Sequence, residues 1–188
     1  MKVTVVRNPN QLYFTSDLHL GHKNIIKYCD RPFHDVDHMD DVIIDNWNSV
    51  IKDDDVVFLL GDIAWGDKKD LETYLARLSG RKILVQGNHD RDKCIPYNMF
   101  DMTYDGFANI FVKEEDKKDG QSITLCHFPM LSWLHSHKGS WNLFGHWHSG
   151  TVRSIEDGDE TSTFVEVSAA LGYSSWLPAL SFARQRNW

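Results

Sequence analysis

Five short blocks of the sequence carry side chains that bind metal ions or transfer protons. In chain order they are Asp17-Leu18-His19, Gly61-Asp62, Gly87-Asn88-His89-Asp90, His127 alone, and Gly145-His146-Trp147-His148. Imidazole, carboxylate and amide groups without a thiolate form a mixed ligand set that suits Mn²⁺, Fe or Zn²⁺ better than Ca²⁺ or a structural zinc. The donors are too many for one tetrahedral ion. They are about enough for two ions that share a bridging ligand and leave room for water.

Each block alone is weak evidence for a metal. A single Asp-x-His or His-x-His is more often structural, and the central block, 87–90, is also a good turn sequence because Gly, Asn and Asp favour turns. The joint occurrence of all five is much harder to obtain by chance. In an extended chain the i, i+2 spacing turns Asp17 and His19 to one face, and likewise His146 and His148. We therefore expect each pair to present two ligands to one point.

The elements that must position these blocks are short strands. In the first half, strands expected at 12–15, 56–60 and 82–85 alternate with helices expected at 21–28, 35–51 and 69–78, from the apolar periodicity. This β-α-β-α-β order predicts parallel strands. Further strands are expected at 102–104, 109–113, 122–126, 141–144 and 163–167, with a hairpin tip at 115–120, and they favour antiparallel pairing. Four of the five blocks directly follow an expected strand, and His127 ends one.

Bulk composition limits the class of protein. The 188 residues, 41% hydrophobic and 25% charged, suit one soluble domain over 1–188. The formal net charge of −7 argues against a general nucleic-acid coat, although two divalent ions would offset part of it. The three cysteines are scattered, no apolar run could span a bilayer, and the N-terminus does not resemble a signal peptide. We therefore expect a cytoplasmic protein with no membrane partner.

The order D-x-H, G-D, G-N-H-D, H, G-H-x-H, from Asp17 to His148, resembles that of the calcineurin-like metallophosphoesterase superfamily. The opening 17–26, with Arg31-Pro32-Phe33, is similar to a subgroup of small bacterial and phage phosphoesterases. The resemblance implies an α/β fold of four layers, α-β-β-α, in which two mixed sheets face each other between helices. It also implies a single metallophosphoesterase domain with a dinuclear centre at the strand ends.

The resemblance assigns ligands and a cofactor. Asp62 would bridge the two ions, because one carboxylate can neutralise two cations. Mn²⁺ is the first expectation for both ions, with Fe, Zn²⁺ or Ni²⁺ as alternatives. One ion would be held by Asp17, His19, Asp62 and His148, and the other by Asp62, Asn88, His127 and His146.

Other residues have expected roles at the substrate. In the family the residue that matches His89 faces the substrate, and an imidazole there could protonate the leaving oxygen. Asp90 would then orient His89, or else only cap the turn. His22 and Arg31 are substrate-binding candidates, with surface or capping roles as the alternatives, and Arg31 could bind a phosphate oxygen bidentately. Trp65 is a candidate for flanking the site.

These assignments predict metal-dependent hydrolysis of a phosphodiester or phosphomonoester by a hydroxide activated between the two ions. A small, nucleotide-like phosphoester is the expected substrate. One alternative is a nuclease acting on nucleic-acid ends, but the lysine pairs 68–69 and 117–118 lie among acids. The other alternative is a non-catalytic scaffold, which a missing ligand or a missing His89 would favour, and neither is missing.

Overall fold

The protein is described by a computed structural model at residues 4–6, 9–90, 95–113, 119–148, 152–157, 160–167 and 177–178. One sheet has five strands in the order β11-β2-β3-β4-β5, of which β2 to β5 follow one another along the chain and β11 comes from residues 177–178. Its strands β2 to β5 are parallel, and β11 joins antiparallel to β2. The predicted parallel arrangement is thus confirmed. The strands are β2 (Leu12–Thr15), β3 (Val56–Leu59), β4 (Arg81–Val85), β5 (Met102–Tyr104) and β11 (Leu177–Pro178).

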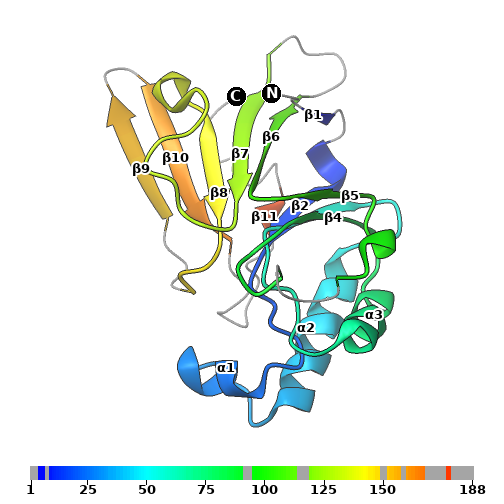
Figure 1. Ribbon diagram of the computed structural model, residues 1–188. Coiled ribbons are helices and arrows are strands. Elements are labelled where there is room, and N and C mark those ends of the chain that lie inside the picture. Colours follow the sequence, from blue (N-terminus) through cyan, green and yellow to red (C-terminus); the bar gives the residue numbers. More distant parts are fainter. Residues whose placement is uncertain are drawn as a thin grey trace.

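Three α-helices cover one face of this sheet (Figure 1). They are α1 (Lys23–Tyr28), α2 (Val36–Val50) and α3 (Lys68–Arg77), close to the predicted bounds. The Asp35 side chain accepts a hydrogen bond from the backbone N–H of His38 and so begins α2. A capping box between Asp67 and Asp70 begins α3. None of the helices in the described ranges is long and apolar enough to cross a membrane.

The alternation of side chains along β3 divides the apolar core into two parts. Val57 and Leu59 pack in the cluster that includes the helices. Phe58, and Leu60 just beyond the strand, pack in the cluster that includes the second sheet. Because successive side chains of a strand point to opposite faces, a continuous apolar run is what a strand buried on both faces requires.

The second sheet has the order β1-β6-β7-β8-β10-β9. β6 with β7 and β9 with β10 are antiparallel, whereas β1 with β6, β7 with β8, and β8 with β10 are parallel. The predicted antiparallel preference is therefore correct only for part of the sheet. Residues 115–118, four of the six residues of the predicted hairpin tip, lie outside the described ranges. The strands are β1 (Thr4–Val6), β6 (Phe107–Val112), β7 (Gln121–Cys126), β8 (Trp141–Phe144), β9 (Val152–Asp157) and β10 (Glu160–Glu166).

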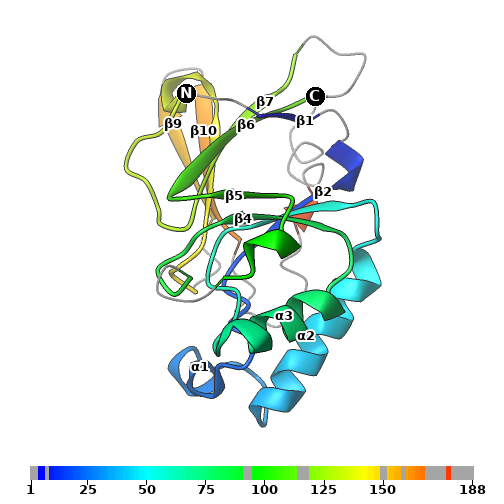
Figure 2. The ribbon, with the colours of Figure 1, turned by 45° about the vertical axis from the view of Figure 1, so that its right-hand side comes forward.

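The two sheets face each other, as the resemblance implied, and Figure 2 shows the helices, one sheet and then the other in succession. Within the described residues, no α-helix covers the outer face of the six-stranded sheet. Trp133, from the segment between β7 and β8, packs there against Phe144. The described part of the chain therefore shows three of the four expected layers. The connection between β7 and β8 contains an irregular segment and a short 3-10 helix, Ser136–Lys138.

Candidate metal centre

The loops that follow β2, β3 and β4 meet at one edge of the five-stranded sheet. Parallel strands place their carboxyl ends together, so three of the blocks converge there. Backbone hydrogen bonds join the first two loops, from Asp17 N–H to the Gly61 carbonyl and from His19 N–H to the Asp62 carbonyl, both at 3.0 Å. The ends of β7 and β8 add the remaining blocks, and Gly145 N–H donates to the His127 carbonyl at 2.9 Å.

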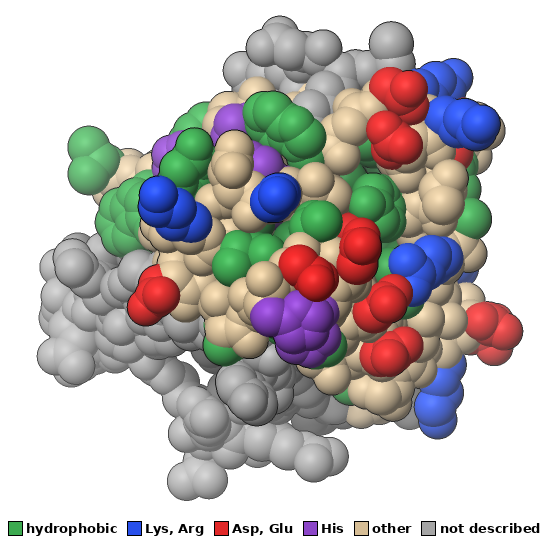
Figure 3. All heavy atoms as spheres, turned by 90° about the horizontal axis from the view of Figure 1, so that it is seen from below, with side chains coloured by type: hydrophobic (Ala, Val, Ile, Leu, Met, Phe, Trp, Pro, Cys, Tyr) green, Lys and Arg blue, Asp and Glu red, His purple; other side chains and the backbone are tan. Residues whose placement is uncertain are grey.

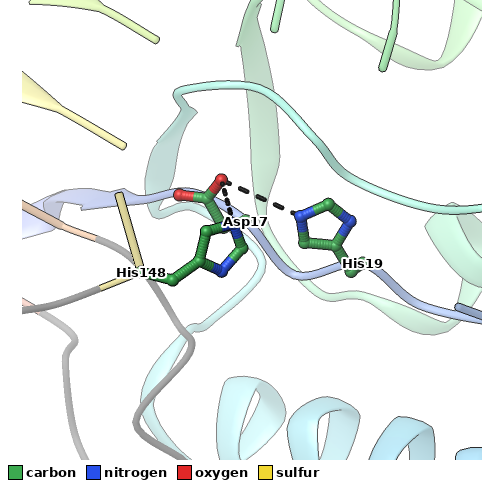
Figure 4. Close-up of side chains that lie close together, drawn as sticks. All are labelled: Asp17, His19 and His148. Carbon is green, nitrogen blue, oxygen red and sulfur yellow. Dashed lines mark ion pairs between the residues drawn. The ribbon is translucent and has the colours of Figure 1, made fainter. Parts of the chain in front are cut away.

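Asp17, His19 and His148 form the first cluster of potential ligands, with one donor atom from each within 4.8 Å of the others (Figure 4). Asp17 Oδ1 lies 3.4 Å from His148 Nε2 and 3.9 Å from His19 Nε2. His19 Nε2 is buried and has no hydrogen-bond partner among the described residues. Atoms that bind one ion at about 2.0–2.2 Å lie roughly 3 Å or more apart, so this spacing suits a shared cation.

Asp17, Asp62 and His127 form the second cluster. His127 Nδ1 lies 2.7 Å from the Leu60 carbonyl oxygen, which can only accept, so Nδ1 carries the ring proton. The lone pair on His127 Nε2 then faces Asn88 Oδ1 at 2.9 Å and Asp62 Oδ2 at 3.5 Å. Three acceptor atoms directed at one another are stabilised by a cation between them, and this is the chemistry of a metal site.

Asp62 touches both clusters. Its Oδ2 lies 3.6 Å from His19 Nε2 as well as 3.5 Å from His127 Nε2. Its Oδ1 accepts a hydrogen bond from the backbone N–H of His89 at 3.0 Å, which holds the carboxylate in this orientation. The His146 ring lies beside that of His127, with centroids 5.1 Å apart. The structure thus gathers all seven expected ligands at one place.

Five of these seven residues have a left-handed backbone. Non-glycine residues seldom take a positive φ, at a cost of about 1–3 kcal/mol each, and such residues concentrate at functional sites. The expectation that the i, i+2 pairs lie in extended chain is therefore wrong. Each pair converges through a turn at the strand end. The φ angles are 55° for Asp17, 52° for His19, 56° for Asp62, 73° for His146 and 56° for His148.

Burial lowers the pKa of three histidines at the centre, His19, His146 and His148. Burial, with a smaller contribution from the positive charge of Arg31, lowers the pKa of His148 to about 4. The same two causes lower the pKa of His19. Burial also lowers the pKa of His146, followed by the neighbouring His127. A neutral imidazole retains the lone pair that binds a metal, so these rings are ready as ligands at neutral pH.

His89 lies beside the centre and reaches solvent. Its Nε2 is 3.9 Å from Asp62 Oδ2, and its side chain is 42% exposed. Its ring centroid lies 5.7 Å from that of His19 and 5.8 Å from that of Trp65. The imidazole can therefore meet a substrate that also reaches the metal-binding clusters.

The predicted orienting role of Asp90 is not what the structure shows. Asp90 is fully buried. Its Oδ2 accepts from the backbone N–H groups of Asp62 at 2.8 Å and Gly87 at 2.9 Å, and its Oδ1 accepts from Ile63 N–H at 3.3 Å. Burial raises its pKa, and the hydrogen bond from Gly87 opposes this. Asp90 thus ties the loop after β3 to the turn after β4, close to the turn-capping alternative.

The predicted contact between Arg31 and substrate is also not supported. Arg31 is 4% exposed. Its guanidinium donates to the carbonyl oxygens of Asp17 at 2.7 Å and Leu18 at 2.9 Å. Arg31 therefore holds the loop that carries the first two ligands. His22 lies nearer to the site, with its Nδ1 3.5 Å from that of His19 and its ring stacked on Trp65.

Sequence reasoning missed two supports of the site. Gly61 and Gly87 pack so closely that a Cβ on Gly61 would lie 2.5 Å from the Gly87 backbone. Asp40 accepts hydrogen bonds from Gly21 N–H, at 2.9 and 3.0 Å, and from the Tyr74 hydroxyl, which anchors the turn after His19. The sequence did contain a signal for Asp40. It lies three residues before Ile43 and seven before Trp47, which places a carboxylate on the apolar face of the predicted helix, where a charged group needs a partner.

Residues 11–161 match the calcineurin-like phosphoesterase family. The chain is 33% identical, over 145 residues, to an uncharacterized protein of Methanocaldococcus jannaschii, covering 74% of this chain and 70% of that one. It is 32% identical to the Gene 66 protein of Mycobacterium phage L5 over 165 residues, covering 76% and 79% of the two chains. A crystal structure of a protein of unknown function from Aquifex aeolicus shares the fold, with a TM-score of 0.67, 24% identity, and coverage of 93% of this chain and 98% of that one.

Proposed function

The chain belongs to the calcineurin-like phosphoesterase family, and from this premise we propose that it hydrolyses phosphoester bonds with two bound divalent metal ions. The proposal is supported chiefly by the convergence of hydrogen-bond acceptor atoms around the Asp62 carboxylate. His127 Nε2, with its lone pair held in place by the Leu60 carbonyl, faces Asn88 Oδ1 and Asp62 Oδ2. On the other side of Asp62, the buried Nε2 of His19 points at the same carboxylate.

The donor set fits two ions. Asp62 is the proposed bridge, and Mn²⁺ the first candidate, because imidazole with carboxylate and amide oxygen suits Mn²⁺, Fe and Zn²⁺. Such ions would ease the loss of a proton from water and offset the charge of a phosphoryl group. The residues proposed to hold one ion are Asp17, His19, Asp62 and His148, and those for the other are Asp62, Asn88, His127 and His146.

The protein's own groups complete the proposed reaction. A water oxygen forms a bond to phosphorus while the bond from phosphorus to the leaving oxygen breaks. His89, exposed next to Asp62, donates a proton to the leaving oxygen. Asp90 holds the turn that carries Asn88 and His89 against the loop of Asp62. Arg31 holds the loop that carries Asp17 and His19.

A small phosphoester is a better candidate substrate than a long nucleic acid. A protein surface that binds the phosphate backbone of a long nucleic acid is expected to be basic, whereas this chain has a net charge of −7. On the face seen in Figure 3, acidic and basic side chains are intermixed, and this face of the described residues carries no continuous basic surface. A nuclease acting on nucleic-acid ends is therefore the second candidate.

Hydrolysis of bis-p-nitrophenyl phosphate and of p-nitrophenyl phosphate, with metal content measured on the same samples, tests the proposal. We expect Mn²⁺-dependent release of p-nitrophenol, at least from the diester. The Asp62→Asn variant should lose bound metal and activity together. Asp41→Asn, at an exposed ion pair with Arg77, is the matched control and should retain both.

Two results would contradict the proposal. Protein with both ions bound that hydrolyses neither ester would favour a non-catalytic scaffold. Asp62→Asn protein that still binds two ions would remove Asp62 from the bridging position.

A further inference from the structure

Trp65 and His22 form a stacked aromatic pair at the edge of the candidate metal centre. Their ring centroids are 4.4 Å apart and their planes differ by 12°. Trp65 is 46% exposed, whereas His22 is buried. The pair thus presents a large flat indole surface supported from below by an imidazole.

The backbone of Trp65 is held in place on both sides. Its N–H donates to the Leu20 carbonyl at 2.7 Å, next to the β-bridge between Leu20 and Ala64. Gly21 packs against its carbonyl so closely that a Cβ there would lie 2.8 Å from the oxygen. The capping box that begins α3 follows two residues later, at Asp67. A surface fixed in this way needs little ordering when a ligand binds.

The pair lies on the side of the centre that holds the proposed proton donor. The Trp65 ring centroid is 5.8 Å from that of His89. His22 extends the contact inward, with its Nδ1 3.5 Å from Nδ1 of His19. A group that leaves phosphorus next to His89 would therefore lie within reach of the exposed indole.

We propose that Trp65, supported by His22, binds the base of a nucleoside leaving group, so that the substrate is a small nucleotidyl phosphodiester. This inference rests on the proposed phosphoesterase function. Stacking on tryptophan accepts any base, because every base has a π-face. Nucleosides are the flat aromatic groups that biological phosphodiesters carry. The acidic chain favours a short substrate over a nucleic-acid strand.

The test compares two diesters of thymidine 5′-phosphate that share the same phosphoryl group. In each, only the cleavage that yields thymidine 5′-phosphate is followed, which releases a second thymidine from the dinucleoside monophosphate and methanol from the methyl ester. Steady-state KM and kcat are measured by chromatography of the products. The proteins are the wild type, Trp65→Ala, Trp65→Phe and the control Phe107→Ala, and their metal content is measured in parallel. Phe107 has the same exposed fraction as Trp65, 46%, and begins β6.

We expect Trp65→Ala to raise KM for the dinucleoside monophosphate about tenfold or more, as the loss of one stacked base does, and to leave the methyl ester nearly unchanged. Trp65→Phe should retain most of the binding, and Phe107→Ala should behave as the wild type. Equal losses on both diesters in Trp65→Ala protein with full metal content would overturn the inference while leaving the phosphoesterase proposal intact. A wild-type protein that hydrolyses neither these diesters nor bis-p-nitrophenyl phosphate would overturn both.

Discussion

Asp90 accepts a hydrogen bond from the backbone N–H of Asp62, with 2.8 Å between Asp90 Oδ2 and the Asp62 nitrogen. The same oxygen accepts from Gly87 N–H at 2.9 Å. One buried carboxylate therefore joins the loop of the proposed bridging ligand to the turn that carries Asn88 and His89. Among the described residues, the pairing of β3 with β4 ends at Leu59 and Leu84, so this link and the hydrogen bond from His89 N–H to Asp62 Oδ1 set the spacing between the two loops.

The Asp90→Asn variant tests this link. An asparagine keeps one acceptor oxygen but directs an NH₂ group at backbone donors, so we expect a loss of about 1–3 kcal/mol in the free energy of unfolding. Metal affinity should fall by about 10- to 100-fold, as is typical when the support of a ligand is removed. Denaturant unfolding and metal titration measure the two effects. Full metal affinity with a shifted pH–rate profile would instead support the orienting role toward His89.

The Arg31→Lys variant separates a loop support from a phosphate contact. A lysine cannot donate from two fixed nitrogens to the carbonyls of Asp17 and Leu18, so we expect about 1–3 kcal/mol of destabilisation and weaker metal binding. Arg81→Lys, at an exposed ion pair with Asp101, should change stability by less than about 1 kcal/mol. A rise in KM alone, with stability and metal content unchanged, would restore Arg31 as a substrate-binding residue.

The His89→Ala variant tests the proposed proton donor. We expect metal content to remain and kcat to fall by about 10²- to 10⁴-fold for a substrate with a poor, alkoxide leaving group. The loss should be much smaller for bis-p-nitrophenyl phosphate, because nitrophenolate leaves without a proton. The measurement compares kcat of the variant and the wild type on bis-p-nitrophenyl phosphate and on the methyl ester of thymidine 5′-phosphate. Equal losses on both would assign His89 to phosphate binding rather than proton transfer.

The metal-free protein should lose stability as the pH falls from about 6.5 toward 4. In that range an unfolded His148 takes up a proton, whereas the folded one, with its pKa lowered to about 4, does not. Protons therefore favour the unfolded state, and the lowered pKa values of His19 and His146 act in the same direction. The raised pKa of Asp90 acts in the opposite direction.

Thermal unfolding in the presence of a chelator, between pH 7 and 5, measures this slope. Because Asp90 is common to all the proteins compared, the His148→Asn variant isolates the histidine and should show a shallower slope. The exposed His137→Asn variant should show the wild-type slope. An unchanged slope in His148→Asn would refute the contribution of this histidine.

Apolar runs and helical periodicity predicted β2, β3, β4 and the three α-helices. Whether an element is buried on one face or on both determines the pattern of apolar residues within a short stretch of sequence, so the pattern can be recognised there. The same patterns did not predict β1 or β9. β9, with Arg153, Glu156 and Asp157, lies at the edge of its sheet, and among the described strands it pairs with β10 alone. An edge strand has little apolar pattern to recognise.

The sequence by itself determined the types and order of the ligand residues and their places after strands, since these are properties of short segments. Only the tertiary structure decided that Asp90 binds the Asp62 loop rather than His89, and that Arg31 faces carbonyls rather than phosphate. It also decided that five of the expected ligands take left-handed backbone conformations. The physical reason is that a buried polar side chain takes the partners that folding brings within hydrogen-bonding distance, and the partners of Asp90 and Arg31 include groups 28 and 14 residues away along the chain.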